Sequence, residues 1–204
     1  MENAQIKEFL REKLNFSNQS IQKLEIFLKI LLKYNSKYNL IAKSTEKIAW
    51  ERHILDSAQI LRLFNRDIRE ISDLGTGAGF PGVILSIYDE KDKFHVKLYE
   101  KSNIKRNFLN IIKKNLNLKF EIYDNVDKYN IESDLIVCRA FKKLDKIIDI
   151  SREKIKKPHK MIILKGKNAE EELKKISLNR NYNYKLKQSI TDRESKIILV
   201  DVKK

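Results

Sequence analysis

The sequence predicts an α/β fold in which a mostly parallel sheet of seven strands follows an N-terminal helical cap. Three observations support this. Residues 1–65 show only helical spacing of apolar residues, short apolar runs alternate with amphipathic segments from about residue 67, and four of the five glycines fall within residues 75–82. Strands that alternate with helices form parallel sheets with right-handed crossovers. We therefore expect a cap over residues 1–65 and a sheet domain over residues 66–204.

Amphipathic helices account for the whole of the expected cap. The first covers residues 2–14, and the second begins after Ser17, a residue type that caps helix N-termini, and ends or bends at the polar residues 35–39. A third is expected over residues 45–63. Two large aromatic residues of these helices are assigned to the core: Phe27 and Trp50.

The expected strands are short apolar or alternating runs. They cover residues 67–73, 94–99, 119–123, 135–138, 161–164, 182–190 and 196–203, with helices opening at Val83 and lying over 103–116, around 147–150 and over 170–176. Residues 191–195 suit the turn of a C-terminal antiparallel hairpin. Ligands of such sheets bind outside the carboxyl ends of the strands, near the switch point. We therefore expect one neighbourhood of four strand-end residues: Gly75, Glu100, Arg139 and Lys165.

The charge of the chain favours a polyanionic partner. Lys and Arg number 43 against 28 Asp and Glu, a net charge of +15. Residues 142–204 hold 19 of these basic residues and 9 of the acidic ones, so +10 of the charge lies in the last third. Such a balance is typical of nucleic-acid binding. A well-solvated surface is the alternative, because the whole chain is rich in Lys, Asn and Ile.

Other classes of protein are disfavoured by the composition. The single cysteine, Cys138, excludes internal disulfides and indicates a reducing compartment. The three histidines are scattered, so we expect no metal site. We find no signal peptide, and no apolar run approaches the roughly 18 residues that a membrane span needs. We expect a soluble, cytoplasmic protein that is a monomer and binds neither metal nor membrane.

The glycine stretch matches two cofactor motifs. Residues 77–82 match GxGxxG, the dinucleotide fingerprint, whereas residues 73–79, DLGTGAG, match the loop of S-adenosylmethionine (SAM) methyltransferases. Glu100 suits both, because either cofactor offers ribose hydroxyls to a carboxylate at that strand end. Asp73 favours SAM, since a carboxylate repels a pyrophosphate but suits a sulfonium and an amino group. A hydride-transfer enzyme also usually needs a second domain, for which 204 residues leave little room.

We therefore predict a SAM site, with an NAD(P)-linked reductase as the alternative. The loop residues expected to contact the cofactor are Asp73, Gly75, Thr76, Gly77 and Gly79.

Several further motifs carry a resemblance to a known family. They are, in order, Tyr38-Asn39-Leu40, Arg52-His53-Ile54-Leu55-Asp56-Ser57, Asp73 to Gly82, Arg139-Ala140-Phe141 and Leu164-Lys165-Gly166. From about residue 20 to the C-terminus the chain resembles the RsmG (GidB) family of bacterial small-subunit ribosomal RNA methyltransferases. The resemblance implies a Rossmann-like class I SAM-dependent methyltransferase fold. It also implies methyl transfer to N7 of guanine 527 in 16S rRNA, within the 30S subunit or its precursor.

The resemblance also implies roles for single residues. Gly75, Gly77, Phe80 and Glu100 would line the cofactor, Val126 and Asp127 would hold the adenine edge, and Arg139 would face the reacting methyl as the residue most involved in catalysis. Guanine N7 has no proton to lose, so alignment and exclusion of water suffice without a general base. Arg139 is then expected to bind guanine or phosphate rather than to act as an acid or base.

Two interpretations stay open for each of the basic residues around this site. Arg52 and His53 either contact RNA or form a polar clamp between cap and sheet, in which Arg52 pairs with Asp56 at i,i+4. Lys165 and Lys167 either bind RNA phosphate or are ordinary exposed strand-end residues. A ribosome-assembly factor that binds RNA without catalysis is a further alternative.

Overall fold

The computed structural model describes residues 1–65, 67–176 and 182–203. Within these ranges seven strands form one sheet in the order β3-β2-β1-β4-β5-β7-β6. The strands are β1 (Glu70–Leu74), β2 (His95–Tyr99), β3 (Phe120–Tyr123), β4 (Leu135–Arg139), β5 (His159–Lys165), β6 (Tyr182–Gln188) and β7 (Lys196–Val202). All neighbours from β3 to β5 pair in parallel, and β7 pairs antiparallel with both β5 and β6. The predicted mostly parallel sheet with a closing hairpin is confirmed.

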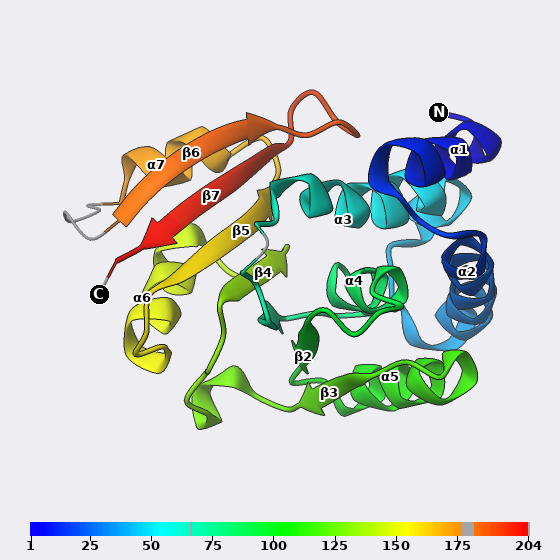
Figure 1. Ribbon diagram of the computed structural model, residues 1–204, viewed down its shortest axis with the longest axis horizontal. Coiled ribbons are helices and arrows are strands. Elements are labelled where there is room, and N and C mark those ends of the chain that lie inside the picture. Colours follow the sequence, from blue (N-terminus) through cyan, green and yellow to red (C-terminus); the bar gives the residue numbers. More distant parts are fainter. Residues whose placement is uncertain (66, 177–181, 204) are drawn as a thin grey trace.

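The helices fall on the two faces of this sheet (Figure 1). They are α1 (Asn3–Leu14), α2 (Asn18–Tyr38), α3 (Asp56–Ala58), α4 (Gly82–Tyr88), α5 (Asn103–Leu116), α6 (Leu144–Lys154) and α7 (Ala169–Lys174). Ser17 and Ser102 cap α2 and α5 by accepting a hydrogen bond from a backbone N–H of the first turn. Asparagines in the left-handed conformation end α1, α2 and α5, because Asn tolerates that backbone geometry.

Alternating strand residues divide the core between the two faces. In β4, Leu135 and Val137 pack on the side of α1, α2, α4 and α5, whereas Ile136 and Cys138 pack on the side of α6 and α7. A strand buried on both faces is what a parallel sheet requires, and it explains the continuous apolar run of β4.

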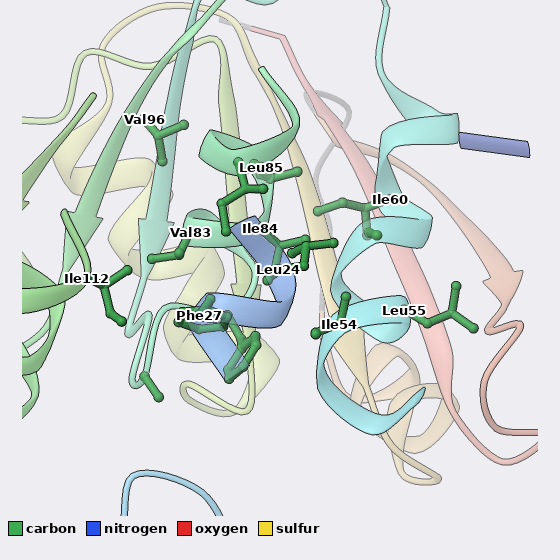
Figure 2. Packing of buried hydrophobic residues seen from close by; sticks show 14 of the residues in the cluster. Leu24, Phe27, Ile54, Leu55, Ile60, Val83, Ile84, Leu85, Val96 and Ile112 are labelled. Atoms are coloured by element: carbon green, nitrogen blue, oxygen red, sulfur yellow. The ribbon is translucent and has the colours of Figure 1, made fainter. Parts of the chain in front are cut away.

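The N-terminal helices share one core with the sheet. Figure 2 shows Leu24 and Phe27 of α2 and Ile54 packed beside Val83 of α4 and Ile112 of α5, and all five are buried. The helices of residues 1–65 therefore lie on the same side of the sheet as α4 and α5, and α2 contacts both of these helices. The predicted boundary between cap and sheet domain falls beside residue 66, which lies outside the described residues.

The third predicted helix is not regular. Residues 43–63 form a 3₁₀ turn (Lys43–Ile48), a π-helical turn (Trp50–Leu55), the short α3 and a second 3₁₀ turn (Gln59–Leu63). In the π turn the Asp56 N–H donates to the carbonyl of Glu51, five residues back. The wider turn separates side chains that an α-helix would place together.

The predicted i,i+4 pair between Arg52 and Asp56 is accordingly wrong. Arg52 is half-exposed and lies 3.4 Å from Asp192 of the β6–β7 loop, whereas Asp56 is buried and lies 3.3 Å from Arg139 at the end of β4. The π turn sends the two side chains in different directions, so each finds its partner in a distant part of the chain.

Candidate functional site

A cavity of about 770 Å³ opens at the carboxyl ends of the parallel strands. Gly75, Glu100, Arg139 and Lys165 all line it, so the predicted neighbourhood is confirmed. The other predicted site residues that line it are Thr76, Gly77, Phe80, Val126, Asp127, Arg52 and His53. Asp73, Gly79 and Lys167 are not among the lining residues. The volume is within the roughly 300–1,000 Å³ that is usual for a small-molecule site.

The glycine loop after β1 lines the cavity with Gly75 and Gly77, and only Gly77 has open space where a side chain would stand. Gly77 has φ +62°, and the nearest heavy atom to a Cβ added there is the Gly75 carbonyl oxygen at 3.9 Å. A side chain at Gly77 would therefore point into open space where a ligand can approach the backbone. At Gly75 an added Cβ would instead meet the ring of Phe141, and at Gly79 it would meet Val83. At these two positions the protein itself fills the space of a side chain, although the Gly75 backbone also lines the cavity.

Asp73 supports the loop from beneath. Its carboxylate is fully buried, and its Oδ2 accepts a hydrogen bond from the Gly82 N–H, 2.7 Å away, at the start of α4. Burial raises the pKa of Asp73 to about 7. The acidic residue of the motif therefore fixes the loop to the helix that follows it and does not face the cavity.

Glu100 is the carboxylate that does reach the cavity. Its Oε2 accepts from the Gly77 N–H at 3.0 Å, and its Oε1 accepts from the Ser102 N–H at 2.8 Å. An ionised carboxylate has about four lone-pair positions, so each oxygen can accept a further hydrogen bond from a ligand. The backbone bonds thus orient an acceptor for hydroxyl groups at the end of β2.

Residues 124–127, after β3, line the cavity together with Glu100. Val126 is buried and begins a short 3₁₀ turn, while the Asn125 side chain accepts a hydrogen bond from the Asp127 N–H at 3.3 Å. The segment offers an apolar side chain and polar backbone to a flat heterocycle. All four residues line the cavity.

Arg139, on the opposite side, connects β4 to the N-terminal helices. Its Nη1 donates to the Arg52 carbonyl at 2.8 Å and to Asp56 Oδ2 at 3.3 Å, and its Nη2 donates to His53 Nδ1 at 2.9 Å. The guanidinium carbon lies 5.0 Å from the centre of the Phe80 ring. A guanidinium has five N–H groups, so these bonds fix its plane and still leave donors for a ligand. Burial lowers the pKa of Arg139.

The loop between β6 and β7 forms a hydrogen bond with Asp56. Thr191 Oγ1 donates to Asp56 Oδ1 at 2.8 Å, and Gln59 Nε2 donates to the same oxygen at 2.9 Å. Gln59 Oε1 in turn accepts from the Ile190 N–H at 2.9 Å. Asp56 thereby joins the helical segment, the hairpin loop and Arg139. Thr191 and Gln59 were not among the predicted site residues, because nothing in the local sequence distinguishes them from ordinary loop and helix residues.

His53 is held as a neutral ring in one tautomer. Thr45 Oγ1 donates its own proton to the Ala42 carbonyl, so it accepts from His53 Nε2–H across 2.8 Å. Nδ1 is then the acceptor for Arg139. The ring also stacks on Phe80, with centroids 5.0 Å apart. Burial and the neighbouring Arg139 lower the pKa of His53 to about 3, so it acts here as a clamp between helix and sheet.

This burial predicts a specific response to acid. Between the ordinary pKa of 6.5 and the folded value of about 3, the unfolded state binds a proton at His53 that the folded state does not. The contribution of the neutral His53 ring to the free energy of unfolding is therefore complete above about pH 6.5. It is lost progressively as the pH falls toward the folded pKa of about 3. We expect the difference in unfolding free energy between wild type and His53→Gln to shrink by about 1.4 kcal/mol per pH unit below that point.

Urea unfolding of both proteins from pH 7.5 to 4.5 measures this difference. The comparison with a variant is needed because Asp73 acts in the opposite direction: its raised pKa makes the folded state bind more protons from about pH 4 to 7. Asp73 is common to both proteins and cancels. Parallel stability curves for wild type and variant would show that His53 is not buried as a neutral ring.

The basic residues near the cavity differ in how free they are. Lys165 Nζ donates to Glu172 Oε2 at 2.7 Å and to the Lys142 carbonyl at 2.8 Å, so its charge is used within the protein. Lys101, Lys142 and Lys167 are exposed, the first two on the cavity wall.

Among the described residues no group of His, Cys, Asp and Glu could hold a metal ion, and no helix is long and apolar enough to cross a membrane.

The chain is similar to known proteins in both sequence and fold. A protein-family model described as "GidB: rRNA small subunit methyltransferase G" matches residues 20–198. The ribosomal RNA small subunit methyltransferase G of Pelagibacter ubique is 34% identical over 196 residues, covering 93% of this chain and 91% of the relative. The protein of the same description from Orientia tsutsugamushi (strain Ikeda) is 36% identical over 200 residues, covering 97% and 98%.

The fold has equally extensive counterparts among solved structures. The O-methyltransferase from Bacillus cereus in complex with SAH superposes with a TM-score of 0.62 at 13% identity, covering 96% of each chain. At that identity the likeness concerns the fold alone, and it confirms the predicted class I methyltransferase architecture.

Proposed function

Because the chain belongs to the GidB family of rRNA small subunit methyltransferases G, we propose that it transfers a methyl group from SAM to N7 of guanine 527 in 16S rRNA. The protein is a SAM-dependent methyltransferase of small-subunit rRNA, and the observation that carries this is the family match over residues 20–198. The family favours the methyltransferase motif over the dinucleotide fingerprint. We further propose the cytoplasmic 30S subunit or its precursor as the substrate, and a monomeric enzyme.

The residues of the cavity fit the methyl donor. We assign Gly77 to close backbone approach, because its missing side chain leaves open space above the loop. We assign Glu100 to the ribose hydroxyls, since both carboxylate oxygens are oriented and can accept again. Val126 and Asp127 take the adenine. Gly75, Thr76 and Phe80 complete this wall, with Asp73 and Gly79 supporting it from within.

The reaction needs positioning and no general base. When bound, SAM supplies a methyl group that is already activated by the sulfonium. The N7 lone pair of guanine carries no proton, so the protein has only to align the base and exclude water. An arginine that reads guanine normally contacts O6 and N7 together. We assign Arg139 to O6, one of these two acceptors. Here N7 must stay free, and the fixed guanidinium can donate to O6 alone.

Transfer of label tests this proposal. Purified protein is incubated with methyl-labelled SAM and 30S subunits from cells that lack the modification, and the labelled position in 16S rRNA is mapped. Label at guanine 527, in the N7 form, is the expected result. Binding of 30S subunits without incorporation of label would instead support the non-catalytic assembly factor. A label on another nucleotide would reject the assigned base and leave the methyltransferase in place.

The exposed lysines near the mouth of the cavity are assigned to RNA phosphates. Lys167 is exposed in the loop between β5 and α7, beside Gly166 on the cavity wall. Lys165, being paired with Glu172, is assigned to holding that loop, with a smaller share of the phosphate contact. Arg52 lies at the same mouth and is half-exposed.

We expect Lys167→Ala to weaken rRNA binding several-fold at low salt and to leave the affinity for SAM unchanged. Each lost phosphate contact should reduce the slope of log K against log salt by about 0.7 to 0.9. The measurement is rRNA affinity at several salt concentrations, with Lys29→Ala, an exposed lysine of α2, as the matched control. An unchanged slope for Lys167→Ala would remove this loop from the RNA-binding surface.

A further inference from the structure

The cavity has two halves that meet where the strand order reverses, between β1 and β4. The loops after β1, β2 and β3 line the half assigned to the methyl donor. The loops after β4 and β5, the hairpin loop and residues between 40 and 56 line the other half. Phe141 lies at the boundary, since it is the second residue after β4 and its ring packs against Gly75 of the loop after β1. A group in this place borders both the donor and whatever accepts the methyl.

The backbone is strained at the residue that aims Phe141. Ala140 has φ +50°, and the other non-glycine residues with positive φ in the described chain are asparagines or an aspartate. Asn and Asp adopt that conformation more readily because their side chains form local hydrogen bonds, which alanine cannot do. Such strain persists where the surrounding structure imposes it, commonly at binding sites. Here it turns the chain so that Phe141 packs back against Gly75.

Phe141 also offers a ring surface that its neighbours do not. Among the described aromatic residues that line the cavity, Phe80 and Tyr99 are each 3% exposed, whereas Phe141 is partly exposed. Phe80 is covered by the His53 ring and the Arg139 guanidinium. The ammonium of the exposed Lys142 lies 5.2 Å from the centre of the Phe141 ring. What distinguishes Phe141 is its partial exposure, and a partly exposed ring beside an exposed lysine suits a nucleobase and its phosphate.

We propose that Phe141 is the stacking platform for the target purine after it leaves the RNA stack. This inference rests on the proposed function, because it concerns the acceptor of the same methyl transfer. An enzyme that modifies a base must take it out of its stack, and the lost stacking is commonly replaced by an aromatic side chain. The Phe141 ring provides this replacement stacking next to the methyl donor. Stacking accepts any purine, so the choice of guanine is left to the polar groups around it, Arg139 included.

The test compares Phe141→Leu with Phe141→Trp. Leucine keeps apolar volume against Gly75 without a π surface, whereas tryptophan restores the surface. We expect Phe141→Leu to lower kcat/KM for 30S subunits roughly 10- to 100-fold, the loss typical of one base–aromatic stack. The Kd for SAM should stay within about twofold, and Phe141→Trp should recover most of the activity. Phe9→Leu, a partly buried phenylalanine of α1 outside the cavity, is the matched control and should behave as wild type.

The outcomes separate this inference from the function beneath it. If wild type transfers label and Phe141→Leu does so equally well, the base stacks elsewhere and the inference is wrong. If SAM affinity falls in parallel with activity, the ring belongs to the donor wall and the inference is again wrong. Failure of wild type itself to methylate the subunit would overturn the proposed function, whatever the variants do.

Discussion

Gly77→Val is expected to abolish SAM binding while the protein stays folded. The free protein has room for the side chain, since the nearest atom to an added Cβ is 3.9 Å away. The fold therefore has to bear only the left-handed backbone at φ +62°, a cost of roughly 1–2 kcal/mol for a residue with a Cβ. The valine methyls, however, would fill the space through which we propose the cofactor approaches the loop.

Calorimetric titration with SAM, alongside thermal unfolding, measures both effects. We expect affinity to fall by at least about 100-fold, or roughly 3 kcal/mol. Gly77→Ala should lie between wild type and Gly77→Val. Gly79→Ala gives the opposite pattern, since its Cβ would meet Val83 inside the protein and should mainly lower stability. Unchanged affinity in a folded Gly77→Val protein would show that the cofactor does not lie over this loop.

The regular elements were predictable because their determinants are local. The helix predicted over residues 103–116 has those bounds in the structure, where Ser102 caps it and Asn117 ends it. The buried strand predicted at 135–138 extends by one residue to Arg139. Apolar periodicity and capping residues act within a few positions of one another, so they can be recognised without knowledge of the fold.

The motif located the loop but did not assign its residues. Four glycines indicate positions where a side chain would not fit. The sequence does not say whether a ligand or another part of the protein occupies the space of the missing side chain. In the structure Gly77 faces open space, whereas Gly75 makes room for Phe141, which lies 66 positions later in the chain. Asp73 was predicted from charge to contact the cofactor, and the structure places it beneath the loop on Gly82.

The polar cluster around Asp56 was beyond sequence reasoning for two physical reasons. The π turn over Trp50–Leu55 breaks the 3.6-residue spacing on which the Arg52–Asp56 prediction depended. Thr191, moreover, contacts Asp56 from a sequence separation of 135 residues. Contacts of this kind depend on how β7 inserts between β5 and β6, which is a property of the whole sheet.

That cluster leads to the second large expected effect, at Arg139. Arg139→Met should destabilise the protein by about 3–5 kcal/mol, because it leaves the buried Asp56 carboxylate without its cation and His53 Nδ1 without its donor. Methyl transfer measured below the unfolding transition should also fall about 100-fold, since misplacement of the base by about 1 Å has that consequence. Arg139→Lys should rescue little, because one ammonium cannot reproduce a planar fork that spans three acceptors.

A double variant separates the structural from the catalytic contribution. Asp56→Asn removes the buried negative charge but keeps an oxygen for Thr191 and Gln59. Arg139→Met combined with Asp56→Asn should therefore recover much of the lost stability in urea unfolding, while methyl transfer stays low. Arg62→Met, an exposed arginine of the same helical segment, should change stability by no more than about 0.5 kcal/mol. If the double variant recovers methyl transfer together with stability, Arg139 only ties the helices to β4 and another group holds the guanine.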